Sequence, residues 1–366
     1  MKIGREQALA FRTAAHNLHE RLPAGSAAAA ARVAGLQDFP PGMAPVALAA
    51  RIEDPDMADL VVVYSIRGAA LAVPREDVAV FTVALGPSDE AAARVMIGSA
   101  VDSLDPVGVG ALDALDRVSA AVADALAGGP LERDDFHQAL RERLPDELLW
   151  WCRGCQSHHV HPSLWRATGI RGVLAVTERR GRVTVFGAPP KARRVKQAPA
   201  ELTRRFLRAY GPATQGDLAS WAGIAPSHAR TLLDAIADET EEVDFDGRAA
   251  LILSADADRF ASPPAASGAR LLPPFDPYLD QRDRGTLWPD PAVRKRARTG
   301  IGAPGVVLVD GEVAGLWRPE KKGKRLVVAV DPLTKAARAA ADALAAEAEA
   351  VAPHRGATSG QIRWVS

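Results

Sequence analysis

The sequence contains little cysteine and no long apolar run. Two cysteines, Cys152 and Cys155, occur among 366 residues, which is too few for a disulfide scaffold and typical of a reducing compartment. The chain lacks a run of about 18 apolar residues, and its first residues are amphipathic instead of charged and then apolar. These absences predict a cytoplasmic protein with neither a membrane-spanning helix nor an export signal.

Net charge is also lacking, because 45 Lys and Arg residues balance 45 Asp and Glu residues. The two signs are nevertheless segregated along the chain. Residues 52–150 hold 19 acidic and 7 basic side chains, whereas residues 151–208 hold 2 acidic and 13 basic ones. Such segregation creates a local positive field that the sum conceals. Charge alone fits either a nucleic-acid surface or a solvated linker.

The basic excess is concentrated at a predicted hairpin tip and just after it. Its cations are Arg179, Arg180, Arg182, Lys191, Arg193, Arg194 and Lys196. Lysine and arginine at such a tip suit phosphate contacts on double-stranded DNA. The alternative interpretation is a solvated wing.

The clearest local pattern lies at residues 201–252. Apolar residues recur at helical spacing, with Thr214 and Ser227 as predicted caps of two short helices. Asp246-Gly247 lies between two β-branched and apolar runs and predicts a hairpin. This order, two helices, a turn, a further helix and a two-stranded wing, is typical of a winged helix.

The same order recurs towards the start of the chain. Helices are predicted near 134–144 and 163–168 before a hairpin at 173–187, and, more loosely, at 4–19, at 25–34 and after Pro41, before a strand within 59–73. The last hundred residues predict a meander or small barrel closed by a helix at 334–351.

The predicted fold is therefore mainly α with an α+β C-terminal part. Tandem winged-helix domains precede a small β-rich domain, which agrees with the two to four domains expected for 366 residues. The predicted segments are a winged-helix-like unit at 1–125, a second at 126–190 with the basic hairpin, a third at 191–265, and a β-rich domain with a terminal helix at 266–366.

Four motifs in order resemble the winged-helix DNA glycosylases of the AlkZ-like and YcaQ-like group. They are "GLQ" at 35–37 with "ALAARI" at 47–52, "YGPATQGDLASWAGI" at 210–224, "LLPPFDPYLDQRDR" at 271–284 and "DGEVAGLWR" at 310–318. The resemblance covers nearly the whole chain. It implies three tandem winged helices around a DNA channel and excision of alkylated purines, including cross-linked ones, without a metal.

The first motif differs from the family's catalytic pattern. By the resemblance, that pattern is Gln-x-Gln or Gln-x-Asp, whereas this chain has Gln37-Asp38-Phe39. Gln37 matches the first position and is expected to hold a water molecule through its amide, and Asp38 is the candidate base or electrostatic stabiliser. The alternative is that Gln37 and Asp38 cap helix ends while Phe39 packs into the core.

Two further segments carry candidate ligands or contacts. Cys152-x2-Cys155 is followed by His158, His159 and His161, which is half of a zinc site, but the chain lacks a second cysteine pair, so we predict no metal. In the motif at 271–284, four side chains either approach DNA or fix a domain joint: Phe275, Asp276, Tyr278 and Arg284.

The predicted protein is a monomeric, DNA-binding, monofunctional DNA glycosylase. It would hydrolyse the N-glycosidic bond of alkylated purines in double-stranded DNA, in base-excision repair or in self-resistance to a genotoxin, with no cofactor. The alternative is a catalytically inactive winged-helix DNA-binding protein, a regulator or damage binder, because Phe39 occupies the second catalytic position.

Overall fold

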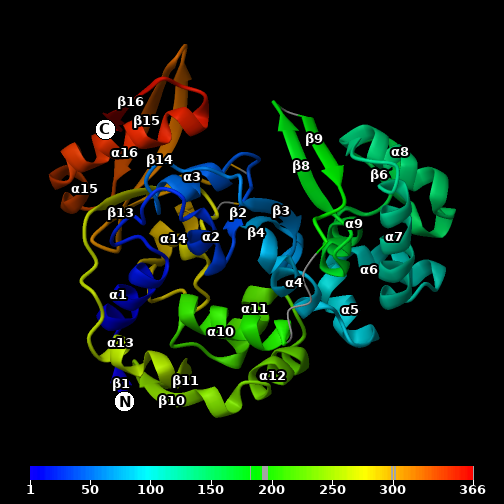
Figure 1. Cartoon of the computed structure of the whole chain (residues 1–366), viewed down its shortest axis with the longest axis horizontal. Helices are drawn as coiled ribbons and strands as arrows, with labels where there is room; N and C mark the ends of the chain where they lie inside the picture. The colour runs from blue at the N-terminus through cyan, green and yellow to red at the C-terminus, as the bar shows by residue number, and fades with distance from the viewer. Residues whose placement is uncertain (182, 192–196, 298–299, 301, 366) are drawn as a thin grey trace. The chain divides into compact units, whose positions relative to one another are not determined.

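The structure is a computed structural model that describes all residues except 182, 192–196, 298–299, 301 and 366 (Figure 1). The chain forms two compact units: unit 1 contains residues 1–57, 204–214 and 238–366, and unit 2 contains residues 58–203 and 215–237. About 46% of the residues are helical and 23% lie in strands, in agreement with a mainly helical chain. The division into three winged helices and a C-terminal domain stays a prediction.

A five-stranded sheet dominates the C-terminal part of unit 1. Three strands joined by the two predicted turns form the predicted antiparallel meander. A fourth strand, not predicted, pairs antiparallel with the first of them, and a fifth, also not predicted, pairs in parallel with the last. The strands are β12 (Ala269–Leu272), β13 (Gly305–Val309), β14 (Glu312–Lys322), β15 (Arg325–Pro332) and β16 (Ser359–Trp364). The helix predicted at 334–351 consists of two helices, α15 (Lys335–Ala339) and α16 (Ala341–Val351), and α16 lies against β16 (Figure 1).

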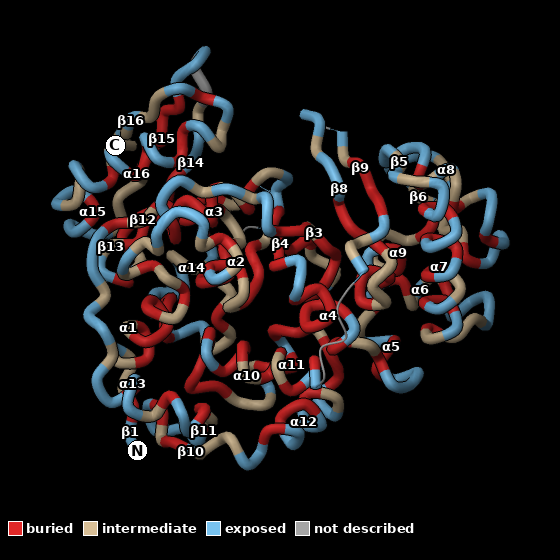
Figure 2. Tube along the Cα trace, in the orientation of Figure 1, coloured by how far each residue is buried: buried red, intermediate tan, exposed pale blue. Residues whose placement is uncertain are grey.

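The core of this sheet also holds α3 (Ala44–Ala49), the helix that follows the Gln37-Asp38 motif. Met43 and Val46 pack with buried residues of the sheet and of α16, so the start of α3 itself is buried. Figure 2 shows the buried and exposed parts of the chain. Trp317 donates its indole N–H to the carbonyl oxygen of Leu272 at 2.8 Å. A Cβ at Gly305 would lie 2.2 Å from the Trp317 nitrogen, so only glycine fits there.

The N-terminal part of unit 1 forms a second, three-stranded sheet with α1 (Arg5–Ala15) and α13 (Ala257–Ala261). The short strand β1 (Lys2–Ile3), which was not predicted, pairs in parallel with β10 (Thr240–Phe245), and β10 pairs with β11 (Arg248–Leu253). The turn between β10 and β11 is at Asp246-Gly247, where φ is 46° and 79°, as the hairpin prediction required. Stacked rings of Phe11 and Phe260, 3.7 Å apart at their centroids, fill the core. The remaining elements of unit 1 are α2 (Ala27–Arg32), β2 (Leu36–Gln37) and α14 (Pro291–Ala297).

Unit 2 combines an antiparallel sheet with helices. Its strands neighbour one another in the order β4, β3, β8, β9, β5. They are β3 (Leu60–Tyr64), β4 (Ala70–Pro74), β5 (Leu131–Glu132), β8 (Ala175–Arg180) and β9 (Val183–Gly187). The single strand predicted within 59–73 is wrong: β3 and β4 are separate, because Arg67 and Gly68 adopt φ of 53° and 66° and reverse the chain.

The helices of unit 2 include those that the sequence predicted. The predictions near 134–144 and 163–168 correspond to α8 (Arg133–Arg143) and α9 (Pro162–Ala167). The others are α4 (Val78–Phe81), α5 (Glu90–Ile97), α6 (Val101–Leu104) and α7 (Ala111–Ala125), and a small hairpin is formed by β6 (Trp150–Cys152) and β7 (Ser157–His159). Among the described residues no single helix is long and apolar enough to cross a membrane. Two helical segments joined by a bend, Glu90–Val107 and Ala111–Ala125, are together long and apolar enough for a span by length and composition only.

The predicted helix-turn-helix is present as α11 (Gln215–Ala222) and α12 (Pro226–Asp234), preceded by α10 (Ala198–Tyr210). Gly223 takes φ of 69° in the turn. Ser227 is not the cap of α12, because Pro226 already occupies the first helical turn and Ala225 is the N-cap. Proline is favoured at this position, where a missing N–H costs nothing.

Candidate active site and nucleic-acid interface

Gln37 is the last residue of β2 and is partly buried. Its side chain makes no hydrogen bond with any of the described residues, so the expectation that it caps a helix is wrong. A primary amide carries two donors and an acceptor. Gln37 therefore offers an uncommitted amide at a fixed point of the backbone, which suits a residue that holds water.

Asp38 is buried, with 4% of its surface exposed. Its Oδ1 accepts hydrogen bonds from the backbone N–H groups of Gly42 at 2.8 Å and Ala44 at 3.2 Å. Ala44 is the first residue of α3, where N–H groups lack partners within the helix and negative charge is favourable. Asp38 thus has the capping role of the alternative interpretation, while its part in catalysis remains a prediction.

Phe39 is 41% exposed, so the expectation that it packs into the core is wrong. Its ring contacts Phe275, with the centroids 5.4 Å apart. The aromatic pair lies at the edge of unit 1 and connects the Gln37-Asp38-Phe39 stretch to the motif at 271–284.

A buried ion pair fixes the other end of α3. Arg51, two residues beyond the helix, donates to both carboxylate oxygens of Asp276 at 2.8 and 2.7 Å, and both side chains are at most 1% exposed. Asp276 also accepts from the backbone N–H of Tyr278. The interpretation of Asp276 and Tyr278 as residues that fix a joint is thereby supported, because neither is available to a ligand in solvent.

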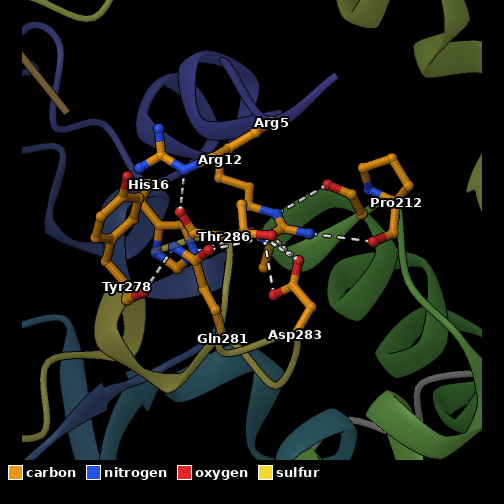
Figure 3. A network of polar contacts seen from close by, with 10 residues as sticks. Arg5, Arg12, His16, Pro212, Tyr278, Gln281, Asp283 and Thr286 are labelled. Carbon is orange, nitrogen blue, oxygen red and sulfur yellow. Dashed lines mark hydrogen bonds and ion pairs between the residues drawn. The ribbon is translucent and has the colours of Figure 1, made fainter. Parts of the chain in front are cut away.

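A second buried arginine joins three distant parts of unit 1 (Figure 3). Arg12 of α1 donates to the carbonyl oxygens of Gly211 and Pro212, each at 3.1 Å, and to Gln281 and Asp283 at 2.7 and 2.8 Å. Each of its three guanidinium nitrogens therefore has an acceptor, as a buried cation requires.

His16, one turn further along α1, lies beside this network. A carbonyl oxygen only accepts, so the Nε2 of His16 donates to the carbonyl oxygen of Ala209 at 3.2 Å. Burial, reinforced by the charge of Arg51, lowers the pKa of His16 to about 3, and the imidazole is neutral at neutral pH. His16 and Arg12 are parts of the core and not of a titrating active site.

The basic hairpin is exposed towards its tip (Figure 2). Its described arginines are partly engaged. Arg179 donates to the Thr184 hydroxyl across the hairpin at 2.8 Å. Arg180 forms exposed ion pairs with Glu132 and Glu178 at 3.0 and 3.2 Å. Lys191 is exposed, while Arg182, Arg193, Arg194 and Lys196 lie outside the described residues. Exposed ion pairs of this kind contribute about 0–1 kcal/mol and are easily exchanged for phosphate.

A second cationic surface was missed from the sequence, apart from Arg284. A cleft of about 460 Å³ in unit 1 is lined by Arg5, Asp246, Arg248, Arg282, Asp283, Arg284, Gly285 and Thr286. Four guanidinium groups from three separate parts of the chain converge here with two carboxylates. No local pattern signals this convergence, because each arginine stands in an ordinary mixed-charge context.

The β6–β7 hairpin brings together part of the cysteine and histidine cluster. The ligand atoms of Cys152, Cys155 and His159 all lie within 4.8 Å of one another. Hydrogen bonds from the backbone N–H of Cys155, and then from His159, lower the pKa of Cys152 to about 7. His158 lies outside this group and His161 caps α9 by accepting from the Ser163 N–H.

Comparison with known proteins decides the family. A family model for AlkZ-like DNA glycosylases matches residues 30–354. The chain belongs to this family. An interstrand DNA cross-link repair glycosylase of Streptomyces sahachiroi is 30% identical to this AlkZ-like chain over 269 residues, which are 69% of each protein.

The fold of this AlkZ-like chain is shared with a solved structure. The DNA glycosylase AlkZ of Streptomyces sahachiroi superposes with a TM-score of 0.76 at 24% identity over the full length of both chains. The resemblance inferred from the four motifs is confirmed by the family match. Membership of a DNA glycosylase family makes DNA the substrate class and DNA repair the process.

Proposed function

We propose that this AlkZ-like protein is a monofunctional DNA glycosylase that hydrolyses the N-glycosidic bond of alkylated purines in double-stranded DNA. The observation that carries the proposal is the uncommitted amide of Gln37, held on a strand end next to a buried carboxylate. The interstrand cross-link repair activity in the name of its relative extends the proposed substrates to purines cross-linked between strands.

Departure of an alkylated purine needs no strong acid catalysis. N-alkylation gives the purine a positive charge, and departure of the base leaves a deoxyribose with oxocarbenium character. An enzyme gains by placing water below that sugar and negative charge near it. Gln37 can accept a hydrogen bond from the attacking water through its carbonyl oxygen and donate one through its amide, which orients the water towards C1′.

Asp38 supplies the negative charge in this proposal. Its Oδ1 accepts hydrogen bonds from two backbone N–H groups, which fix the carboxylate in place beside Gln37. We assign Asp38 to electrostatic stabilisation of the sugar cation and to holding the backbone beside Gln37, in preference to proton abstraction. In this assignment Asp38 has two roles: its charge stabilises the sugar cation, and its hydrogen bonds hold the backbone that carries Gln37.

DNA contact is assigned to the basic hairpin and the chain that follows it. Arg179, Arg180, Arg182, Lys191, Arg193, Arg194 and Lys196 would contact phosphates, within three tandem winged helices at 1–125, 126–190 and 191–265. The exposure of the hairpin tip and the weakness of its ion pairs support this assignment. We propose that the protein acts as a monomer in the cytoplasm.

The test is incubation of the protein with duplex DNA carrying 7-methylguanine, with release of free base and formation of abasic sites as the measured quantities. Gln37→Ala should slow release by roughly 10- to 100-fold through lost placement of the water without weakening DNA binding. Gln361→Ala, which removes an exposed glutamine from β16, is the matched control and should leave the rate unchanged.

A catalytically silent DNA-binding protein is the second candidate. It is favoured by the occupied Oδ1 of Asp38 and by Phe39 at the family's second catalytic position. Phe39→Gln restores the Gln-x-Gln pattern. A parent protein that binds DNA but releases no N-alkylated purine, with no gain from Phe39→Gln, would establish the silent protein and end the glycosylase proposal.

A further inference from the structure

The β6–β7 hairpin of unit 2 is a separate two-stranded sheet with only three residues in each strand. Trp150 pairs with His159, Trp151 with His158 and Cys152 with Ser157. Directly opposed residues share a face and alternate along each strand. Cys152 and His159 therefore project from one face of the hairpin, and His158 projects from the other.

The turn of the hairpin adds a second thiol to the same face. Cys155 lies in the connection between the strands, where Gln156 adopts φ of 52° and donates to the carbonyl oxygen of Arg153 at 2.7 Å. Both sulfurs and a nitrogen of His159 lie within 4.8 Å of one another. Ligands at about 2.0–2.3 Å from a tetrahedral zinc ion are separated by roughly 3.3–3.8 Å, so atoms within 4.8 Å of one another lie near the spacing that zinc needs.

The hydrogen bonding of His159 leaves the correct nitrogen for a metal. Its Nδ1 lies 2.8 Å from the carbonyl oxygen of Val160. Since a carbonyl oxygen only accepts, Nδ1 donates to Val160, and Nε2 is the ring nitrogen left to face Cys152 or a metal. Ligating histidines characteristically donate their other ring N–H to a carbonyl or carboxylate in this way.

The hairpin also has reason to need a metal. An isolated two-stranded hairpin is marginally stable in water, and Trp151 of this hairpin is 45% exposed while Cys155 is exposed. A divalent ion bound by Cys152 at the end of β6, Cys155 in the turn and His159 of β7 would cross-link the two strands and the turn.

We propose that Cys152, Cys155 and His159 hold a zinc ion, with a water molecule in the fourth position. Binding of one Zn²⁺ to the two thiols and the neutral imidazole releases two protons and forms two Zn–S bonds and one Zn–N bond. The site is independent of Gln37 and of the glycosylase chemistry, and its function is to order the β6–β7 hairpin. The prediction of no metal depended on the missing second cysteine pair, whereas here the histidine of the returning strand supplies the third ligand.

The experiment uses the full chain, loaded with Zn²⁺, freed of excess metal by gel filtration and analysed for zinc. We expect about one zinc per chain in the parent and at least tenfold less in Cys152→Ser and His159→Ala. His158→Ala is the matched control, because it removes the adjacent imidazole from the opposite face, and should retain the zinc.

Substitution with Co²⁺ gives a second measurement that does not depend on variants that fold poorly. The parent should show thiolate-to-cobalt charge transfer and the visible bands of tetrahedral cobalt. A parent that holds no more zinc than Cys152→Ser and lacks the cobalt bands overturns the proposal. So does a mass lower by two hydrogens in the absence of zinc, because the two thiols would then form a disulfide.

Discussion

The Gln37-Asp38 region and the basic hairpin differ in where their charged side chains lie and in what holds them. Around α3, the carboxylates of Asp38 and Asp276 are buried and engaged by fixed donors. On the β8–β9 hairpin, Arg180 is paired at the surface with two exposed carboxylates. A buried group without its partner is costly, whereas an exposed pair exchanges with solvent or phosphate at little cost. The first region suits a rigid chemical site and the second suits a surface that attaches to and leaves DNA.

The strongest test of this difference is to remove one member of a buried ion pair and one member of an exposed ion pair. Arg51→Ala leaves the Asp276 carboxylate buried without its cation, and the free energy of unfolding should fall by about 3–5 kcal/mol. Arg94→Ala removes one member of the exposed Arg94–Asp105 pair, held at 2.7 Å, and should leave the free energy of unfolding close to that of the parent, because solvent screens an exposed pair. Urea unfolding followed by circular dichroism measures both. Equal losses would show that burial does not separate the two kinds of pair.

The buried side of the comparison also predicts a pH dependence. The pKa of His16 is about 3 in the folded protein and 6.5 as its ordinary value, so the unfolded chain takes up the proton first as pH falls. The free energy of unfolding should therefore decrease below pH 6.5 by up to about 1.4 kcal/mol per pH unit until pH approaches 3. His16→Gln should flatten this decrease between pH 6.5 and 4.5.

The control for that experiment is His158→Gln on the exposed face of the β6–β7 hairpin. It should follow the parent curve in urea unfolding at each pH. If His16→Gln follows the parent as well, the imidazole is protonated in the folded protein and the inference from burial is wrong.

Two helix-capping aspartates separate the role of charge from the role of capping. Asp38→Asn keeps an oxygen for the N–H groups at the start of α3 but removes the negative charge, and should slow base release at least about 10-fold. Asp89→Asn makes the same change at α5, where Asp89 accepts from Ala92 N–H at 2.8 Å. It should leave base release unaffected.

Both aspartate variants should melt within a few degrees of the parent, which thermal unfolding checks, because a lost cap costs about 1 kcal/mol. If Asp38→Asn releases base as fast as Asp89→Asn, Asp38 acts only as a cap.

For the exposed hairpin, the salt dependence of DNA affinity measures how many of its cations contact phosphates. If all seven predicted cations contact phosphates, affinity should fall with salt at a log–log slope of about −6. Replacing Arg179, Arg180 and Arg182 with alanine should flatten that slope by about 2–3 units. The triple variant of Arg94, Arg117 and Arg143 removes the same charge from elsewhere in unit 2 and should change the slope little. An unchanged slope in the hairpin variant removes the hairpin from the interface.

Local patterns in the sequence predicted most of the elements but not their long-range partners. The Asp246-Gly247 and Asp310-Gly311 turns were predictable because positive φ favours exactly such residue pairs. The two-residue strand β1 was not, because it is defined by pairing with β10, more than 230 residues away in the chain. Helix periodicity carries no information of that kind.

The candidate site shows the same limit. The resemblance identified Gln37, and Asp38 became a candidate because it lies next to Gln37. Neither indicated that the Asp38 oxygen would bond N–H groups four and six residues ahead. The exposure of Phe39 depends on the path of the chain after Asp38, which hydrophobicity alone predicts incorrectly. Convergence of Cys152, Cys155 and His159 follows from strand register, which spacing between cysteines does not reveal.

The contacts of Arg12 imply that unit 1 cannot finish folding until most of the chain has been synthesised. Its partner Asp283 follows 271 residues later, a delay on the order of 10–50 s at ordinary rates of synthesis. The uninterrupted stretch 58–203 of unit 2 leaves the ribosome in the meantime and can assemble first. The first 57 residues must therefore wait as the unfinished beginning of unit 1. A chaperone that shields them should raise the yield of native protein most during that interval.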